Sequence, residues 1–310
     1  GIDSLLTTFL RFFCLLPAFT PVLRRSPPPD RHRKGPARSP TVTEITTAWP
    51  WQDEGMSIPA FELMAALRSG QSTSPRLTWY GPDAERVELS GRVLDNWVAK
   101  TSNLLQDELD AEPGTRLRLD LPAHWKSVVL ALAAWQLGME VVLDAADADL
   151  LATAEPGPAA AEGAFDAVVA VALPALAMRW LGELPSGVVD YAAEVRSHGD
   201  FFMPHVDPEA GRRAVQDSAG AAYSHAELMQ GFAAPAPATQ TASAPTASPV
   251  ASPVASAEGG ERVLVRAAEG LEAVLAKCLG AWLRDGSVVL VHPDVAVTER
   301  LLGDERVSRS

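Results

Sequence analysis

The side chains that could carry chemistry in this 310-residue sequence are a few histidines, serines and clustered aspartates. His198 and His205 lie on either side of Asp200, and His124 and His225 each stand where a helix is expected to begin. Imidazole is a common metal ligand and general base, but a zinc site needs three or four ligands, and no third ligand accompanies the pair. We therefore expect these histidines to cap helices or to pack, and only His225 is kept as a candidate binding residue.

The aspartates and serines are equally incomplete as sites. Asp144, Asp147 and Asp149 follow a predicted strand, but the run lacks the glycine turn and terminal glutamate of a calcium-binding loop. Ser218 and Ser224 lack the Gly-x-Ser-x-Gly elbow that exposes a nucleophilic serine. The residues alone therefore predict no catalytic group and no metal site.

Composition restricts the class of partner. The formal net charge is −13 and the isoelectric point is near 4.9. Nucleic acid and anionic membranes are also negative, so neither is an expected partner. With 47% hydrophobic residues the chain can bury one large core or two modest ones. We expect an acidic cytoplasmic protein.

The first 55 residues differ from the rest in charge and pattern. They hold seven Lys or Arg against five Asp or Glu, so they carry +2 while the remainder carries −15. The apolar stretch 5–23 lacks a basic start and is interrupted by Arg11, which predicts neither an export signal nor a membrane span. The Arg- and Pro-rich stretch 24–40 predicts disorder. Two interpretations stay open: the working protein starts at Met56, or the segment is a basic targeting arm.

A regular α/β pattern begins at Leu77. Strand, helix and strand in succession, with an apolar second helix ended by Gly138, are typical of a parallel unit with a right-handed crossover. We therefore predict an α/β fold with a parallel-rich, doubly wound sheet flanked by helices. The expected strands are 77–80, 86–89, 116–121, 140–143, 167–171, 187–191 and 287–291, and the expected helices are 59–67, 90–109, 125–137, 174–181, 225–232 and 271–283.

Residues 233–260 separate two parts of this pattern. Their composition is dominated by Ala, Pro, Ser and Thr, which predicts a flexible linker. The helix-strand unit 261–310 is too small to hold a core alone, so we expect it to dock on the α/β domain 56–232.

Several short motifs resemble the scaffold of the adenylate-forming (AMP-binding) superfamily, which includes the acyl-CoA synthetases. The resemblance covers about two thirds of residues 56–310 and corresponds to the N-terminal subdomain of those enzymes. It implies their fold and does not by itself imply their activity. The matching pieces are Val87-Glu88-Leu89-Ser90, the helix 96–105, Pro113-Gly114-Thr115-Arg116-Leu117, Leu121-Pro122, Ala133 to Met139, and the helix and strand 275–291.

Residues 218–228 resemble what is left of the phosphate-binding loop of that superfamily. In the superfamily this loop uses backbone N–H groups and a lysine to hold the pyrophosphate end of ATP. Here the loop is shortened, contains Gly220 as its single glycine and has no lysine, and the later motifs of the superfamily have no counterpart in this sequence. The resemblance implies Ser218, Gly220 and His225 as binding residues and AMP or ATP as the cofactor.

Three functions follow as hypotheses. The first is a non-catalytic relative that binds a nucleotide or an acyl-adenylate-like small molecule. The second is a protein partner or subunit of a larger enzyme, and the third is residual AMP-forming acid-CoA ligase activity by an altered loop.

Overall fold

The computed structural model describes residues 58–69, 72–143, 147–157, 164–233 and 260–308. The predictions for the first 55 residues, the start at Met56, Asp144 and nearly all of the linker lie outside this part. The described residues belong to one compact unit, Glu54–Ser310. Its main elements are α1 (Pro59–Ser69), β1 (Pro75–Tyr80), β2 (Arg86–Ser90), α2 (Gly91–Glu108), β3 (Arg116–Asp120), α3 (Trp125–Leu137), β4 (Glu140–Val142), β5 (Leu150–Thr153), β6 (Ala167–Ala170), β7 (Val188–Asp190), α5 (Tyr191–Glu194), β8 (Arg213–Gln216), β9 (Ala222–Ser224), β10 (Arg262–Arg266), α6 (Leu271–Trp282), β11 (Ser287–Val291) and α7 (Glu299–Asp304).

The strands form two sheets. The larger sheet has seven strands in the order β7-β6-β5-β3-β4-β8-β9, and only its β8–β9 pair is antiparallel. The smaller sheet has the order β10-β11-β1-β2, with β1 antiparallel to β2 and parallel to β11. The predicted parallel-rich α/β fold is therefore confirmed, and the predicted strands 77–80 and 86–89 form the antiparallel β1–β2 pair.

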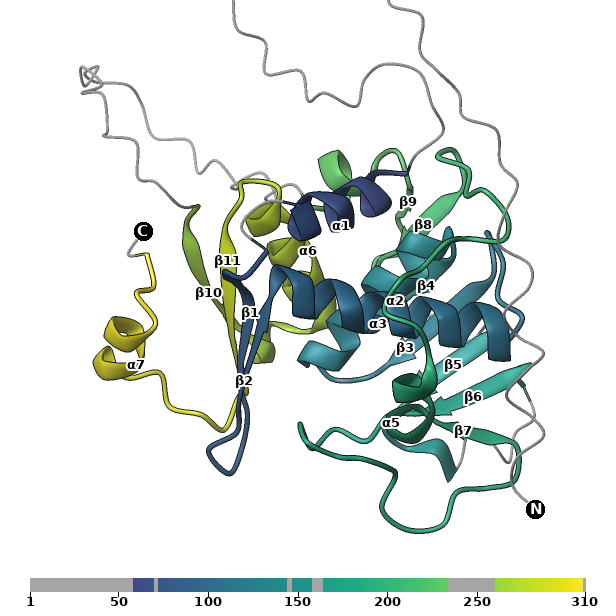
Figure 1. Cartoon of the computed structure of the whole chain (residues 1–310), viewed down its shortest axis with the longest axis horizontal. Helices are drawn as coiled ribbons and strands as arrows, with labels where there is room; N and C mark the ends of the chain where they lie inside the picture. Colours follow the sequence, from purple (N-terminus) through teal and green to yellow (C-terminus); the bar gives the residue numbers. More distant parts are fainter. Residues whose placement is uncertain (1–57, 70–71, 144–146, 158–163, 234–259, 309–310) are drawn as a thin grey trace, which may run out of the picture. The chain divides into compact units, whose positions relative to one another are not determined.

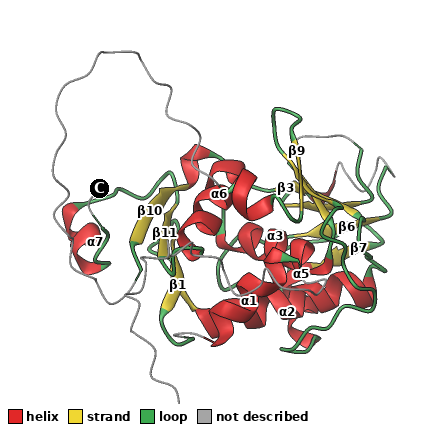
Figure 2. Cartoon of the chain, turned by 90° about the horizontal axis from the view of Figure 1, so that it is seen from above, coloured by secondary structure: helices red, strands yellow, loops and turns green. Residues whose placement is uncertain are grey.

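Helices α1, α2, α3 and α6 lie between the two sheets (Figure 1). The view from above shows the same order of layers (Figure 2). Every residue of α3 is buried, because the helix is enclosed by α1, α2, α6 and the strands β3 and β4. This burial explains why the sequence of α3 is apolar almost all round.

The caps of α2 and α3 agree with the sequence. The Ser90 side chain accepts a hydrogen bond from the amide of Val93, which satisfies one of the free donors at the start of α2. Gly138 adopts a left-handed φ of 85° at the end of α3, and a Cβ there would lie 2.6 Å from Cβ of Pro208. Glycine is needed at this position for both reasons.

The strands that follow the linker extend the smaller sheet. β11 pairs with β1 over Leu77–Tyr80, and β10 continues on the other side of β11. The indole N–H of Trp282, at the end of α6, donates to the carbonyl of Arg76 (2.9 Å). Residues about 200 positions apart in the sequence thus complete one sheet.

The prediction of a helix at residues 174–181 is wrong, because this segment forms a turn and bends. Its backbone forms one internal bond, from the Ala177 amide to the carbonyl of Pro174 (3.1 Å), and several of its other groups bond to side chains. Lys126 Nζ donates to the carbonyls of Ala172 (2.5 Å) and Pro174 (2.8 Å), and the Ala175 amide donates to Glu85 (2.8 Å). Arg196 donates to the carbonyls of residues 177 and 178.

The helix predicted at residues 225–232 is shorter than expected. Only Leu228–Phe232 is helical, as a single π-type turn. None of the described helices is long and apolar enough to cross a membrane.

Lys126→Met is expected to lower the free energy of unfolding by about 1–3 kcal/mol, because two carbonyls would lose their buried donor. Methionine keeps most of the length of the lysine stem, so the loss would report the hydrogen bonds. Urea unfolding at pH 7 measures the change. Arg92→Met, on the exposed side of α2, is the control and should alter stability by less than about 0.5 kcal/mol. Equal stability of the two variants would contradict the role given to Lys126.

Candidate functional site

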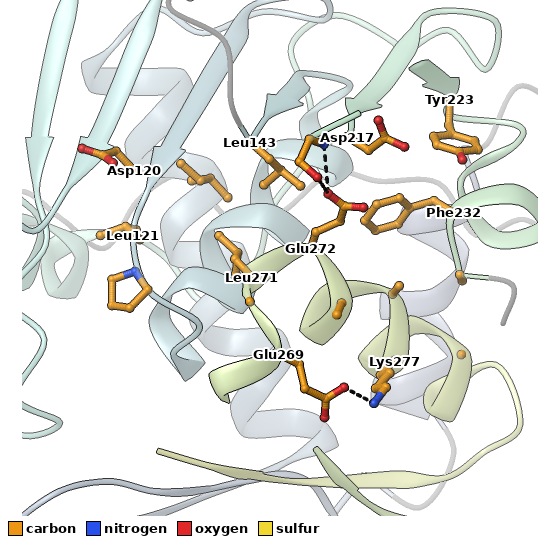
Figure 3. Close-up of a pocket in the computed structure, with 18 of the residues that line it drawn as sticks. Asp120, Leu121, Leu143, Asp217, Tyr223, Phe232, Glu269, Leu271, Glu272 and Lys277 are labelled. Carbon is orange, nitrogen blue, oxygen red and sulfur yellow. Dashed lines mark hydrogen bonds and ion pairs between the residues drawn. The ribbon is translucent and has the colours of Figure 1, made fainter. Parts of the chain in front are cut away.

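A hollow of about 1340 Å³ opens at the carboxyl ends of β3, β4, β5 and β8, with α6 along one side (Figure 3). β3 and β5 are neighbours in the sheet. From β3 the chain passes through α3 to β4, on one side of this pair, and from β5 it passes to β6, on the other side. Adjacent parallel strands whose connections diverge create a crevice, and this is the usual ligand site of open α/β sheets. Asp120 and Thr153 lie at the ends of β3 and β5, and the Thr153 hydroxyl donates to the Asp120 carboxylate (3.2 Å).

The turn between β8 and β9 borders this hollow. Gly220 has a φ of +85°, which a residue with a side chain rarely adopts. The Asp217 carboxylate accepts hydrogen bonds from the amides of Ala219 (3.0 Å) and Ala221 (2.7 Å). The Gly220 amide donates to the carbonyl of Asp217, and the Asp217 amide donates to the carbonyl of Ala221. Four of the five amides in the turn 217–221 are thus bonded within the turn itself.

The fifth amide is bonded by a residue of α6. The backbone N–H and the hydroxyl of Ser218 both donate to Oε2 of Glu272, at 2.9 and 2.6 Å. Figure 3 shows the Glu272 side chain pointing from the first turn of α6 to the loop. All the amide donors of this turn therefore have partners within the chain.

The charged side chains around the hollow are mainly acidic. Glu269 forms an ion pair with Lys277. Although partial burial alone would raise it, the pKa of Glu269 is held below its usual value by Lys277 and by the Arg266 amide. The hollow is lined by five carboxylates, those of Asp120, Glu155, Asp217, Glu269 and Glu272, and by two basic side chains, Lys277 and Arg284. A highly negative ligand such as a triphosphate would meet net repulsion here.

Two aromatic rings form an apolar wall beside the loop. Tyr223 and Phe232 both line the hollow, and their ring centroids are 5.9 Å apart in an edge-to-face arrangement. Phe232 packs in turn on Trp135 of α3, with the centroids 6.1 Å apart. Gly231 lets Tyr223 approach, because a Cβ there would lie 2.8 Å from the tyrosine ring. This wall offers a surface for a flat or apolar group.

The three predicted binding residues occupy different positions. Ser218 lines the hollow, whereas Gly220 lies at the exposed tip of the turn and His225 is fully buried. Burial lowers the pKa of His225 to about 4, although the backbone of Gly138 and Met139 partly offsets this effect. Neither ring nitrogen has a hydrogen-bond partner of good geometry among the described residues. A binding role for these three residues remains a prediction.

Two of the other histidines, His124 and His205, lie against helices. His124 caps α3, where its Nδ1 accepts from the Lys126 amide (3.1 Å), and burial lowers its pKa to about 3. His205 lies 3.9 Å from the Asp107 carboxylate on the exposed side of α2. In the described ranges no three His, Cys, Asp or Glu side chains are grouped so that they could hold a metal ion.

Sequence reasoning missed Glu272, Asp217 and the aromatic wall. Asp217 directly precedes the predicted loop, so its position was a usable signal. Glu272 lies 54 residues after Ser218, and Phe232 was expected in an ordinary helix. Their contact with the loop depends on how α6 packs, which no local pattern indicates.

Comparisons with known proteins agree with the fold. No family model matches the chain. A "TIGR03089 family protein" of Mycobacterium tuberculosis (strain ATCC 25618 / H37Rv) is 36% identical over 244 residues, which are 76% of this chain and 90% of that protein.

Two solved structures share the fold at low sequence identity. An acyl-CoA synthetase of Brucella canis matches 80% of this chain and 46% of its own length, with a TM-score of 0.58 and 17% identity. The anthranilate CoA ligase AuaEII in complex with anthranoyl-AMP matches 81% of this chain and 47% of its own, with a TM-score of 0.54 and 12% identity. The chain thus spans about half the length of these enzymes, and the predicted resemblance to the adenylate-forming fold is confirmed.

The buried His225 makes stability depend on pH in a defined window. Its pKa is about 4 in the folded chain against 6.5 when exposed, so the unfolded chain binds the extra proton between these values. Stability is therefore lost as pH falls from 6.5 to 4, by about 1.4 kcal/mol for each unit of pKa difference.

His225→Phe is expected to reduce the slope of this part of the profile, measured by urea unfolding at several pH values, while the buried His124 still contributes to it. Phenylalanine keeps an aromatic ring and does not titrate. The control is His205→Phe, at an exposed position, which should leave the wild-type slope. An unchanged slope in His225→Phe would contradict a buried neutral imidazole.

Proposed function

Because this chain belongs to the TIGR03089 family and has the fold of the first part of an acyl-CoA synthetase, we propose that it binds a nucleotide or acyl-adenylate-like small molecule without activating it. The observation that carries the proposal is a ligand-sized hollow beside a loop whose amide donors are all bonded within the chain.

The position and size of the hollow support binding. It lies at the divergence of β3 and β5, and its volume of about 1340 Å³ is large enough for a drug-sized ligand. Tyr223 and Phe232 supply an aromatic surface on which a base or an acyl group could stack. The structural relative AuaEII holds anthranoyl-AMP, which is a ligand of the proposed class.

The chemistry of the loop argues against activation. Transfer of an adenylyl group from ATP requires donors and cations that stabilise the leaving pyrophosphate. In this turn the amides at positions 217–221 bond to Asp217, Ala221 and Glu272, and two of these partners are carboxylates. Pyrophosphate would have to displace negative groups that already satisfy the donors.

A second candidate function is a partner subunit of a larger enzyme. The segment 173–187 carries three strongly exposed apolar side chains, Leu176 (85%), Met178 (66%) and Leu181 (79%). Its backbone is fixed by Lys126, Glu85 and Arg196. Apolar side chains held outward on a fixed loop are typical of a contact surface.

A thermal-shift and calorimetric screen of the full chain tests the first candidate. The probes are adenosine, AMP, ATP, CoA and a non-hydrolysable acyl-sulfamoyl adenosine, in which a sulfamate replaces the phosphate of an acyl-adenylate. We expect the mimic to stabilise the fold by about 2.7 kcal/mol at one hundred times its Kd. ATP should give the smallest effect because of the acidic lining.

Phe232→Ala tests whether the ligand uses the aromatic wall. Loss of the stacking surface should weaken binding of the mimic by roughly tenfold, which corresponds to about 1.4 kcal/mol. Phe201→Ala removes an exposed phenylalanine outside the hollow and should leave the affinity unchanged.

The outcomes separate the functions. A flat screen would contradict ligand binding and favour the partner subunit. ATP–pyrophosphate exchange above background over a panel of carboxylic acids would contradict the non-catalytic proposal and support residual AMP-forming ligase activity.

A further inference from the structure

We propose that Glu272 determines the specificity of the hollow by occupying the position on the β8–β9 loop that a ligand phosphate would take. The inference rests on the proposed function and names its ligand class: molecules with no phosphate at the loop. Uncharged nucleosides and their neutral acyl derivatives belong to this class.

The contact with Ser218 has the geometry of an anion site. One backbone N–H and one hydroxyl converge on a single oxygen, Oε2 of Glu272, at 2.9 and 2.6 Å. A phosphate oxygen accepts hydrogen bonds from the same kinds of donor at the same distances. The carboxylate therefore stands in for an external anion and satisfies both donors.

The helix that carries Glu272 is firmly placed. Val274, Leu275 and Cys278 of α6 are buried in the core, so the first turn of the helix has a fixed position against the loop. A carboxylate in a first turn is also favoured by the helix dipole. Glu272 is thus held at the loop by its helix as well as by its two hydrogen bonds.

The neighbouring charges act in the same direction. Asp217 uses its carboxylate on two further amides of the turn, and Asp120, Glu155 and Glu269 line the same hollow. A phosphate that displaced Glu272 would leave this carboxylate unpaired among other carboxylates. Negative side chains that line one hollow disfavour the binding of an anion in it.

Two substitutions separate the blocking effect of Glu272 from its charge. Glu272→Ala removes the side chain and frees both donors of Ser218. Glu272→Gln removes the charge, but its amide oxygen can still accept from Ser218. Titration calorimetry at constant ionic strength, with adenosine, AMP and inorganic pyrophosphate as separate probes, measures each protein.

The wild-type chain should prefer adenosine to AMP and give no heat with pyrophosphate. In Glu272→Ala the preference for adenosine over AMP should fall by roughly tenfold or more, because two donors become available to an anion. Pyrophosphate should also bind to this variant. Glu272→Gln should lie between the two.

Glu155→Gln is the matched control. Glu155 lines the same hollow, but its side chain is not bonded to Ser218. The substitution Glu155→Gln removes one negative charge and leaves Glu272 bonded to the loop. The ratio of the adenosine and AMP affinities should therefore change by less than about threefold. An effect as large as that of Glu272→Ala would mean that general charge sets the preference, and would overturn the inference.

The failure of this inference differs from the failure of the proposed function. If no adenosine compound binds any variant, ligand binding as proposed fails, yet pyrophosphate binding by Glu272→Ala alone would still support the role of Glu272. If a folded Glu272→Ala chain, verified by its unfolding transition, binds pyrophosphate no better than wild type, the role of Glu272 is refuted. Tight binding of pyrophosphate to wild type would refute it as well.

Discussion

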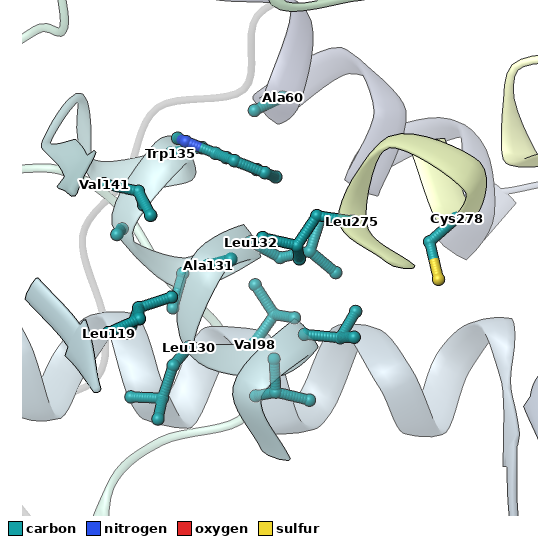
Figure 4. Packing of buried hydrophobic residues seen from close by; sticks show 14 of the residues in the cluster. Ala60, Val98, Leu119, Leu130, Ala131, Leu132, Trp135, Val141, Leu275 and Cys278 are labelled. Carbon is teal, nitrogen blue, oxygen red and sulfur yellow. The ribbon is translucent and has the colours of Figure 1, made fainter. Parts of the chain in front are cut away.

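The enclosure of α3 is the constraint on which the rest of the structure depends. All thirteen of its residues are buried, and the helix contacts α1, α2 and α6 as well as strands of the larger sheet. Figure 4 shows Leu132 of α3 beside Leu275 of α6, with Val98 of α2 near them. An apolar helix of this kind has no face for water, so neighbours must cover it on every side. The larger sheet and the helices α1, α2 and α6 meet this requirement, and α6 packs in turn on β10 and β11 of the smaller sheet.

This packing also fixes the candidate site. Because α6 must cover α3 and the smaller sheet, its first turn is brought to the carboxyl ends of β3 and β8. The Trp135 indole of α3 donates to the carbonyl of Ala214 in β8 (2.8 Å), which ties the β8–β9 hairpin to the same helix. The loop and Glu272 therefore meet as a consequence of how the core is built.

Much of the fold could be predicted from the sequence because its signals are local. The cap at Ser90, the end of α3 at Gly138 and the β1–β2 turn each depend on residues close in the chain. The error at 174–181 has a physical cause. This segment was predicted as a helix, but the buried Lys126 and the half-buried Glu85 bond parts of its backbone.

The site was less predictable than the fold for the same reason. The loop could be found from the residues around Ser218, whereas its occupation by a carboxylate 54 residues away is a tertiary contact. Of the two strands of the smaller sheet that follow the linker, only one was predicted from the sequence. Ser287–Val291 was predicted as a strand, but Arg262–Arg266, which pairs beside it, was not.

A loop that does not bind phosphate, as proposed for this chain, still has to satisfy its own backbone. Five consecutive amides at the edge of a hollow need acceptors, and an unpaired donor costs free energy wherever water is excluded. In enzymes that hold ATP, the nucleotide provides acceptors in the loaded state. Here Asp217, Ala221 and Glu272 provide them from within the chain.

The hollow itself does not depend on the loop. It arises from the divergence of the connections that leave β3 and β5, and from α6 beside them. Both α3, which follows β3, and α6 are packed in the core. Under the proposed function, loss of phosphate chemistry in the loop therefore leaves the cavity in place. The core around α3 can therefore present a ligand-sized site, lined mainly by carboxylates, whether or not the loop takes part in a reaction.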